Sequence, residues 1–84
     1  MYTASIVTSD LSQSVLSNLS QTLLVEGRRF NVDIYRAEDQ DFWTLEVIND
    51  EGTSFVWDEP FATDQAALGA ALAAFEKEGA VGFG

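Results

Sequence analysis

The sequence predicts a small α+β domain in which a three-stranded antiparallel meander packs with helices in the order α-β-β-β-α. Three observations lead to this class. Segments with alternating apolar residues follow one another between residues 28 and 57. The segments on either side show the apolar spacing of helices. The length of 84 residues suits one domain, 1–84, and the 46% of apolar residues are enough for one core.

The N-terminal part of the chain predicts a helix over residues 10–27. Asp10 and Gln13 resemble a capping box, and Gly27 suits the position after a helix end. The segment 22–26 is also compatible with an extended conformation leading into the next strand. Before the helix, Thr3–Thr8 is β-prone, which fits either an additional edge strand or an ordered tail. The helical stripe consists of Leu11, Val15, Leu19 and Leu23.

Three segments have the two-residue period of half-buried strands. In residues 28–36, Phe30, Val32 and Ile34 share one face. The segment "FWTLEVIN" repeats the pattern, and "TSFVWD" forms the third strand. The residues expected on the core face of the second and third strands are Trp43, Leu45, Val47, Phe55 and Trp57.

Parity determines the strand registers, because a slip of one residue turns every side chain to the other face. A three-residue loop, 50–52, keeps the core residues of both strands together, with Gly52 in the left-handed position of a type I turn plus bulge. The pairs predicted here are Val47 with Phe55 and Leu45 with Trp57. The same argument applied to residues 37–41 pairs Ile34 with Trp43, Val32 with Leu45 and Phe30 with Val47.

A second helix is predicted between Thr63 and Gly79. Thr63 is a suitable N-cap, and Asp64 places negative charge where the helix dipole favours it. Pro60 lacks an amide hydrogen and therefore ends strand pairing before this helix. After the helix, Phe83 either docks on the core or is free. The face expected to meet the sheet carries Leu68, Ala71, Leu72 and Phe75.

The charge balance restricts the classes of function. Four basic residues oppose fourteen acidic ones, and the net charge is −10. Such a chain repels phosphates and anionic membranes, so we expect no direct binding to nucleic acid or membrane and favour a basic protein partner. Without Cys or His, catalytic triads that depend on those residues are excluded within the chain. No signal peptide or membrane span is recognised, which predicts a soluble, cytoplasmic protein.

Carboxylates dominate from Glu38 to Asp64, where every charged residue is acidic. Their spacing does not match an EF-hand loop, so we predict no metal site and no cofactor. An enzyme that uses carboxylates alone or with a metal is the weakest hypothesis, since no deep pocket is expected to desolvate Glu46 and Asp58. The arginines Arg28, Arg29 and Arg36 border one strand, and neighbouring acids are expected to neutralise part of their field.

The second face of the sheet holds the candidate contact surface. An apolar group within a polar face can mark a partner surface, or it can be covered by the first helix, and both alternatives fit the sequence. Asp58 and Glu59 would form an acidic rim beside Val56. The candidate protein-contact residues are Tyr35, Glu46, Ile48, Val56, Asp58 and Glu59.

The segments "DFWTLEV" and "TDQAAL" (Thr63–Leu68) occupy places comparable to those of the HicB-type antitoxin domain, and the strand–strand–strand–helix order from Phe30 to Glu78 resembles that family. The sequence is also similar to small bacterial proteins of unassigned function. Three departures exist: a predicted helix before the strands, no segment after the last helix for DNA binding, and "DEPFA" in place of the family's glycine-containing turn. The resemblance implies a small basic toxin as the partner.

Three hypotheses about function follow. The leading one is a non-catalytic interaction or regulatory module that binds another protein, as a monomer or weak homodimer. The alternative is a HicB-like antitoxin or an acidic DNA mimic that binds a basic protein. The carboxylate- or metal-dependent enzyme comes last.

Overall fold

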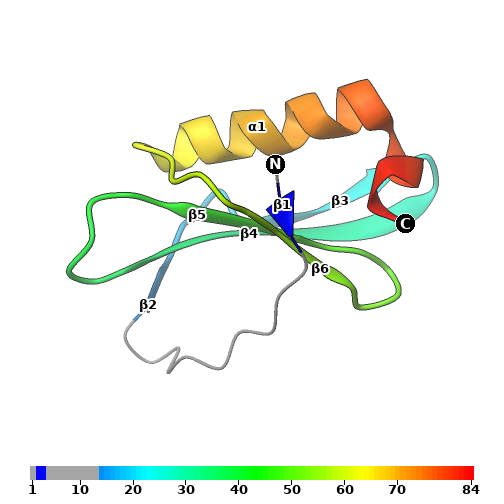
Figure 1. The fold of residues 1–84 in the computed structure, drawn as a ribbon. Helices are drawn as coiled ribbons and strands as arrows, with labels where there is room; N and C mark the ends of the chain where they lie inside the picture. The colour runs from blue at the N-terminus through cyan, green and yellow to red at the C-terminus, as the bar shows by residue number, and fades with distance from the viewer. Residues whose placement is uncertain (1, 4–13) are drawn as a thin grey trace.

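All strands that the structure describes belong to one antiparallel sheet, and the helix α1 lies across it (Figure 1). The computed structural model describes residues 2–3 and 14–84. The α+β class is confirmed, but the order of elements is not α-β-β-β-α. The elements are β1 (Tyr2–Thr3), β2 (Ser14–Leu16), β3 (Gln21–Val25), β4 (Arg28–Ala37), β5 (Thr44–Ile48), β6 (Ser54–Trp57), α1 (Asp64–Glu78) and a 3₁₀ turn (Ala80–Phe83).

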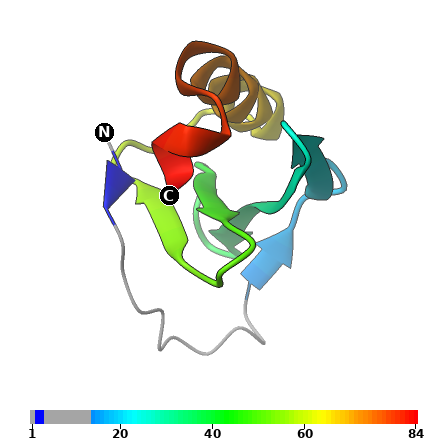
Figure 2. The same cartoon turned by 90° about the vertical axis from the view of Figure 1, so that its right-hand side faces the viewer.

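The long strand β4 organises the sheet. The strand order is β1-β6-β5-β4-β2, and β3 pairs with the same edge of β4 as β2 does. β3 covers the first half of β4, from Arg28 to Val32, and β2 covers the end, from Tyr35 to Ala37. Figure 2 shows α1 and the 3₁₀ turn on the same side of the sheet. Only one face of the sheet is therefore covered by helix within the described residues.

The predicted first helix is wrong over residues 14–25, which form β2, a turn and β3. Serine hydroxyls explain the turn, because such groups compete for backbone hydrogen bonds and disfavour helix interiors. The Ser17 hydroxyl accepts from the Leu19 amide at 3.0 Å, and the Ser20 hydroxyl accepts from the Ile34 amide at 3.0 Å. The extended alternative for 22–26 is correct as far as Val25. The Asp10–Gln13 capping box and residues 4–8 lie outside the described residues.

Gly27 belongs to a hairpin turn instead of a helix end. Val25 pairs with Arg28, which leaves Glu26 and Gly27 as a two-residue loop. Both residues have positive φ, 54° and 80°. Positive φ at both central positions is the requirement of a type I′ turn, whose twist matches that of the two strands.

The β5–β6 hairpin has the predicted register. Val47 pairs with Phe55 and Gly52 has φ 85°, as expected for the three-residue loop. The Asn49 side-chain oxygen accepts from the amides of Glu51 and Thr53, each at 2.9 Å. The side chain of Asn49 thus stabilises the loop that parity had identified.

The β4–β5 register differs from the prediction by two residues. Val32 pairs with Val47 and Ile34 with Leu45, so the predicted rows Phe30–Val47–Phe55 and Val32–Leu45–Trp57 are wrong in their β4 members. A shift of two preserves which face each side chain occupies. Trp43 falls outside β5 and forms an isolated bridge with Phe61, through hydrogen bonds of 2.7 and 3.0 Å. This bridge joins the β4–β5 connection to the segment that leads into α1.

The helix begins and ends where predicted, but its buried face is rotated. The Thr63 hydroxyl accepts from the Ala66 amide, and Gly79 follows the last turn with φ 67°. Ala67 and Ala71 are fully buried, whereas Leu72 is 47% exposed and does not belong to the core face. The core consists of Phe30, Val32, Ile34, Leu45, Val47, Trp57, Ala67, Ala71, Phe75, Ala80 and Phe83.

Phe83 is docked and fully buried. Its ring lies 4.8 Å from that of Phe75 and 5.4 Å from that of Phe55, measured between centroids, and the Phe55 contact is edge-to-face. Such pairs add to the stabilisation that burial alone provides. The 3₁₀ turn is also held at its start, where the Ala80 amide donates to Glu26 Oε1 at 2.6 Å.

Candidate functional site

The face of the sheet opposite α1, called here the open face, is built by the alternation of β4, β5 and β6. Because Phe30, Val32 and Ile34 are buried under the helix, the intervening residues of β4 point to the other side. The same parity applies to β5 and β6 through their registers. The open-face residues of these three strands are Arg29, Asn31, Asp33, Tyr35, Thr44, Glu46, Ile48, Ser54 and Val56.

Four of the six predicted contact residues come together on the open face. Glu46 lies opposite Val56 in the β5–β6 ladder, and Ile48 lies two residues along the same strand. Tyr35 lies on β4 opposite Thr44. All four are half-buried, so each side chain is partly accessible.

The other two predicted residues lie beyond the strands. β6 ends at Trp57, so Asp58 and Glu59 follow it in the connection to α1. Both are exposed. They extend the acidic character past the end of β6 and are not part of the sheet ladder.

Asp33 is the open-face residue that the sequence prediction missed. The two-residue error in register placed Glu46 across from the neutral Asn31, whereas Glu46 pairs with Asp33. Two carboxylates are therefore directly opposite each other, an arrangement that usually destabilises a sheet. No local sequence signal reveals this pair, because a shift of two residues leaves every side chain on its face.

The electrostatics of the open face follow from this pair. Burial, and secondly the charge of Glu46, raise the pKa of Asp33 above its ordinary value. Burial, followed by the charge of Glu46, raises the pKa of Tyr35 to about 12. The Ser54 hydroxyl donates a hydrogen bond to Glu46 Oε2. The centre of the open face thus concentrates negative charge beside a neutral phenol.

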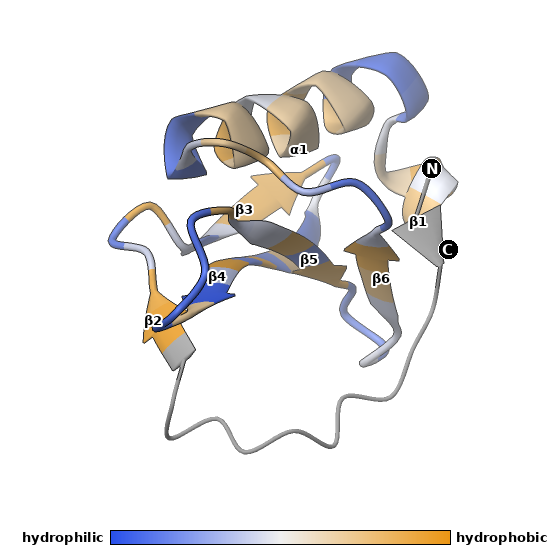
Figure 3. Cartoon of the chain, turned by 60° about the vertical axis from the view of Figure 1, so that its left-hand side comes forward, coloured by the Kyte–Doolittle hydropathy of each residue, from blue (hydrophilic) through white to orange (hydrophobic). Residues whose placement is uncertain are grey.

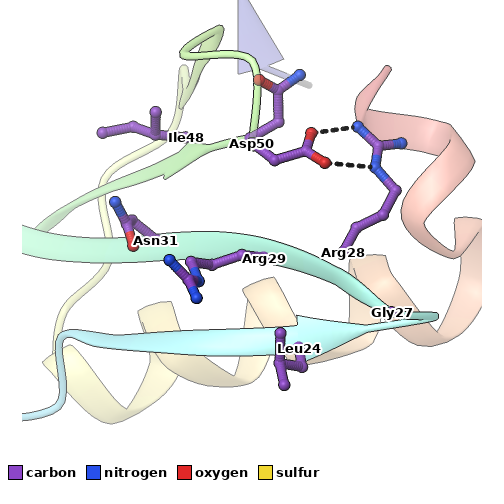
Figure 4. Close-up of a pocket in the computed structure, with 8 residues that line it drawn as sticks. Leu24, Gly27, Arg28, Arg29, Asn31, Ile48 and Asp50 are labelled. Atoms are coloured by element: carbon purple, nitrogen blue, oxygen red, sulfur yellow. Dashed lines mark hydrogen bonds and ion pairs between the residues drawn. The ribbon is translucent and has the colours of Figure 1, made fainter.

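A shallow pocket of about 460 Å³ adjoins the β3 side of the open face (Figure 4). Arg28 crosses it to form a two-point ion pair with Asp50, with nitrogen–oxygen distances of 2.7 and 3.2 Å. Their mutual hydrogen bonding lowers the pKa of Asp50 and raises that of Arg28. The pocket is lined by Leu24, Gly27, Arg28, Arg29, Asn31, Ile48, Asn49 and Asp50.

Two of the three arginines have structural contacts. Arg28 is paired with Asp50 and lies 5.4 Å from the centre of the Phe30 ring. Arg36 donates to the carbonyl oxygens of Ala37, Glu38 and Gln40 and lies 5.2 Å from the Trp43 ring centre. Acids and carbonyls therefore neutralise much of the basic field, as expected from the sequence.

Other site types find little support in the geometry. In the part of the chain that the structure describes, no three His, Cys, Asp or Glu side chains gather closely enough to hold a metal ion. Among the same residues, α1 is too short and too polar to cross a bilayer, and no other helix qualifies.

The fold and the open face define a small α+β domain with an acidic, partly apolar sheet face. Comparison of the chain with protein families, curated proteins and solved structures finds no match.

Proposed function

We propose that this protein is a non-catalytic interaction module that binds a basic protein segment on its open face. The observation that carries the proposal is the combination of the opposed carboxylates Asp33 and Glu46 with half-buried Tyr35, Ile48 and Val56 on a sheet face that no described helix covers. Apolar groups inside a polar face mark partner surfaces, and the net charge of −10 favours cationic partners.

The pairing of acids with apolar residues also specifies the chemistry of the partner. A segment that repeats two Lys or Arg and then two small apolar residues presents both kinds of side chain on one face when it is extended. Such a segment would place cations at Asp33 and Glu46 and apolar side chains against Val56. Cations at this position would relieve the repulsion between the two carboxylates, which have no basic side chain opposite them in the described ladder. Binding therefore neutralises an unfavourable pair in the free protein.

A second candidate follows the HicB resemblance. The strand–strand–strand–helix order on which the resemblance depends is that of β4, β5, β6 and α1. In this version the basic partner is a small toxin, or the acidic face imitates DNA. Both versions place the partner on the open face and share the test below.

The test is a titration of the isotope-labelled protein with a synthetic peptide that repeats Lys-Lys-Val-Val, monitored by amide chemical shifts. We expect the largest shifts at Asp33, Tyr35, Glu46 and Val56, and weaker binding as salt rises, because exposed charges are screened over about 10 Å at 0.1 M salt. Val56→Lys is expected to weaken binding. The control, Val81→Lys, adds the same charge at a residue that is 84% exposed on the 3₁₀ turn.

Two outcomes would overturn the proposal. One is a set of shifts spread evenly over all acidic segments, including the 38–41 loop. The other is equal loss of affinity in Val56→Lys and Val81→Lys.

A further inference from the structure

Among the described residues, the β3 side of the sheet is an unpaired edge. In the described part of the chain, β3 pairs with β4 and with no other strand. Unpaired edges present backbone donors and acceptors to any strand of suitable sequence, and most proteins protect them with charges, proline or a covering segment. β3 has neither a charge nor a proline in its sequence QTLLV.

The distribution of charge makes this edge unusual within the molecule. The chain carries a net charge of −10, yet the sequence from Leu11 to Val25 contains no Asp, Glu, Lys or Arg. Both strands at this edge, β2 and β3, come from that uncharged stretch. Figure 3 shows apolar colouring on both of them. Electrostatic repulsion between two copies is therefore weakest here.

Exposed apolar side chains gather at the same edge. Leu24 on β3 is 74% exposed, and Leu16 on β2 is 63% exposed. Their partners on β4 are Arg29 and Tyr35, which places both leucines on the open-face side of the edge.

The helix adds two more leucines above the edge. The Ser17 hydroxyl donates to Asp64 Oδ2 at 2.7 Å, which turns the Asp64 side of α1 toward the β2–β3 edge. Residues four apart share a side of a helix, so half-buried Leu68 and Leu72, which is 47% exposed, follow on this side. Apolar surface thus lies both above and below the backbone of β3.

The β3–β4 turn determines which backbone groups face outward. A two-residue hairpin loop closes on a hydrogen-bonded pair, here Val25 and Arg28, and such pairs alternate along an antiparallel ladder. Gln21, Leu23 and Val25 therefore use their backbone groups toward β4. The N–H and C=O groups of Thr22 and Leu24 point away from the sheet, into the free edge.

We propose that β3 pairs antiparallel with β3 of a second copy of this chain, about a twofold axis at Leu23. Thr22 then exchanges both backbone hydrogen bonds with Leu24 of the second copy. By the twofold symmetry, Leu24 of the first copy forms the same pair with Thr22 of the second. Leu24 lies diagonally across from the second copy's Leu24, within reach on the open-face side. Glu26 falls opposite Ser20, so the register places no carboxylate against another.

A second copy fits this edge better than the basic partner proposed for the open face. A basic segment gains nothing from an edge without carboxylates, whereas β3 offers a second β3 an uncharged surface of matching polarity. The two interactions also respond to salt in opposite directions. Salt screens the overall repulsion between two chains of charge −10 and strengthens the dimer, while it weakens binding of a basic segment.

Sedimentation of the 84-residue chain over a concentration series, at low and high salt, tests the proposal. We expect a reversible dimer that tightens with salt. Leu24→Lys is expected to weaken dimerisation about twenty-five-fold, since each of the two symmetry-related cross-strand pairs loses a factor of roughly five and the two factors multiply. Val81→Lys, with the same change of charge on the 3₁₀ turn, is expected to dimerise at least as well as the wild type.

Amide hydrogen exchange provides a measurement that needs no variant. The amides of Thr22 and Leu24 are expected to exchange rapidly in dilute protein and slowly in concentrated protein. A chain that stays monomeric at high salt and high concentration would refute the proposal. So would a dimer that Leu24→Lys leaves intact, or one whose exchange protection appears at Val56 instead of Thr22.

Discussion

The side-chain amide of Asn49 donates a hydrogen bond of 2.8 Å to the carbonyl oxygen of Phe83, and both residues are buried. With its side-chain oxygen already bonded to the amides of Glu51 and Thr53, Asn49 links the β5–β6 loop to the 3₁₀ turn. One side chain therefore fixes two segments that are distant in sequence.

Replacement of Asn49 by Ala is expected to lower the free energy of unfolding by about 2–3 kcal/mol. The loss arises because a buried carbonyl and two loop amides lose their partner, and an unsatisfied buried group costs about 1–3 kcal/mol. Chemical denaturation measures the effect. Asn31→Ala, which removes one exposed hydrogen bond with Thr22, is the control and is expected to cost less than about 1 kcal/mol. Equal losses in the two variants would contradict the structural role of Asn49.

Two glycine-to-alanine substitutions are expected to have opposite signs. Gly79 has φ 67°, and an added Cβ would lie 2.7 Å from Glu26 Oε1, so Gly79→Ala is expected to cost about 1–2 kcal/mol. Gly69 lies inside α1 with open space around it, so Gly69→Ala is expected to gain about 1 kcal/mol through helix propensity. Thermal unfolding of both variants decides. A stabilising effect at Gly79 would show that the helix does not end as described.

Asp33→Asn is expected to raise the free energy of unfolding at pH 7 by less than about 1 kcal/mol, since the pair with Glu46 is partly exposed. A carboxyl group whose pKa is raised by folding binds more protons in the folded state. The protein therefore gains stability as pH falls through that raised pKa and loses it as pH rises. The advantage of Asp33→Asn should disappear as pH falls below the ordinary pKa of 3.8, where the Asp33 carboxyl is protonated in both the folded and the unfolded state, and denaturation curves at several pH values can measure this.

The matched substitution, Asp50→Asn, is expected to change the free energy of unfolding in the opposite direction. The hydrogen bonds from Arg28 lower the pKa of Asp50, so its contribution to stability is present above the pKa of an unfolded Asp and is lost as pH falls through the lower, folded value. Asp50→Asn is therefore expected to be less stable than wild type at pH 7, with the difference vanishing in acid. If both substitutions changed the free energy of unfolding at pH 7 in the same direction, the environment described for Asp33 or the one described for Asp50 would be wrong.

Tyr35 is expected to ionise near pH 12, compared with 10.0 for an ordinary tyrosine. A Tyr2→Phe background leaves Tyr35 as the only tyrosine, and tyrosinate absorbance then follows its titration. Glu46→Gln should lower the pKa of Tyr35 only part of the way, because burial is the larger cause and the charge of Glu46 the smaller. If the pKa of Tyr35 were unchanged in Glu46→Gln, Tyr35 would not lie close to Glu46.

Parity was sufficient for the centre of the sheet. The alternation in β4, β5 and β6 predicts the buried face, and Gly52 predicts the loop between the last two strands. Parity fails for the β4–β5 register because a shift of two residues leaves every face unchanged. The error depends on Trp43, which bridges Phe61 instead of continuing β5. This contact joins segments whose proximity no local pattern encodes.

The two errors about helices have physical causes of different kinds. Leucines four residues apart are compatible with a helix, but Ser17 and Ser20 bond to backbone groups and allow two short strands to share one edge of β4. In α1, the apolar spacing suggested that Leu72 faces the sheet together with Ala71 and Phe75. Ala71 and Phe75 are buried as predicted, but Ala67 is buried in place of Leu72. Small side chains let a helix approach closely, and the aromatic rings beneath it, Phe30 and Phe83 among them, supply the apolar volume.

The candidate surface could be predicted as a face but not as a set of neighbours. Tyr35, Glu46, Ile48 and Val56 share the open face because parity is robust. The pairing of Glu46 with Asp33 depends on the register and so could not be foreseen.

At the far end of the sheet, β1 contributes only Tyr2–Thr3 beside β6. A continuous sheet of many copies needs a long, unpaired strand at both edges of each copy, because one edge pairs with the preceding copy and the other must pair with the next. Within the residues that the structure describes, one edge is five residues long at β3 and the other two at β1. Short edge strands are a common protection against such growth. Even with an uncharged edge, the native fold therefore resists assembly into fibrils, and concentrated solutions are expected to remain clear.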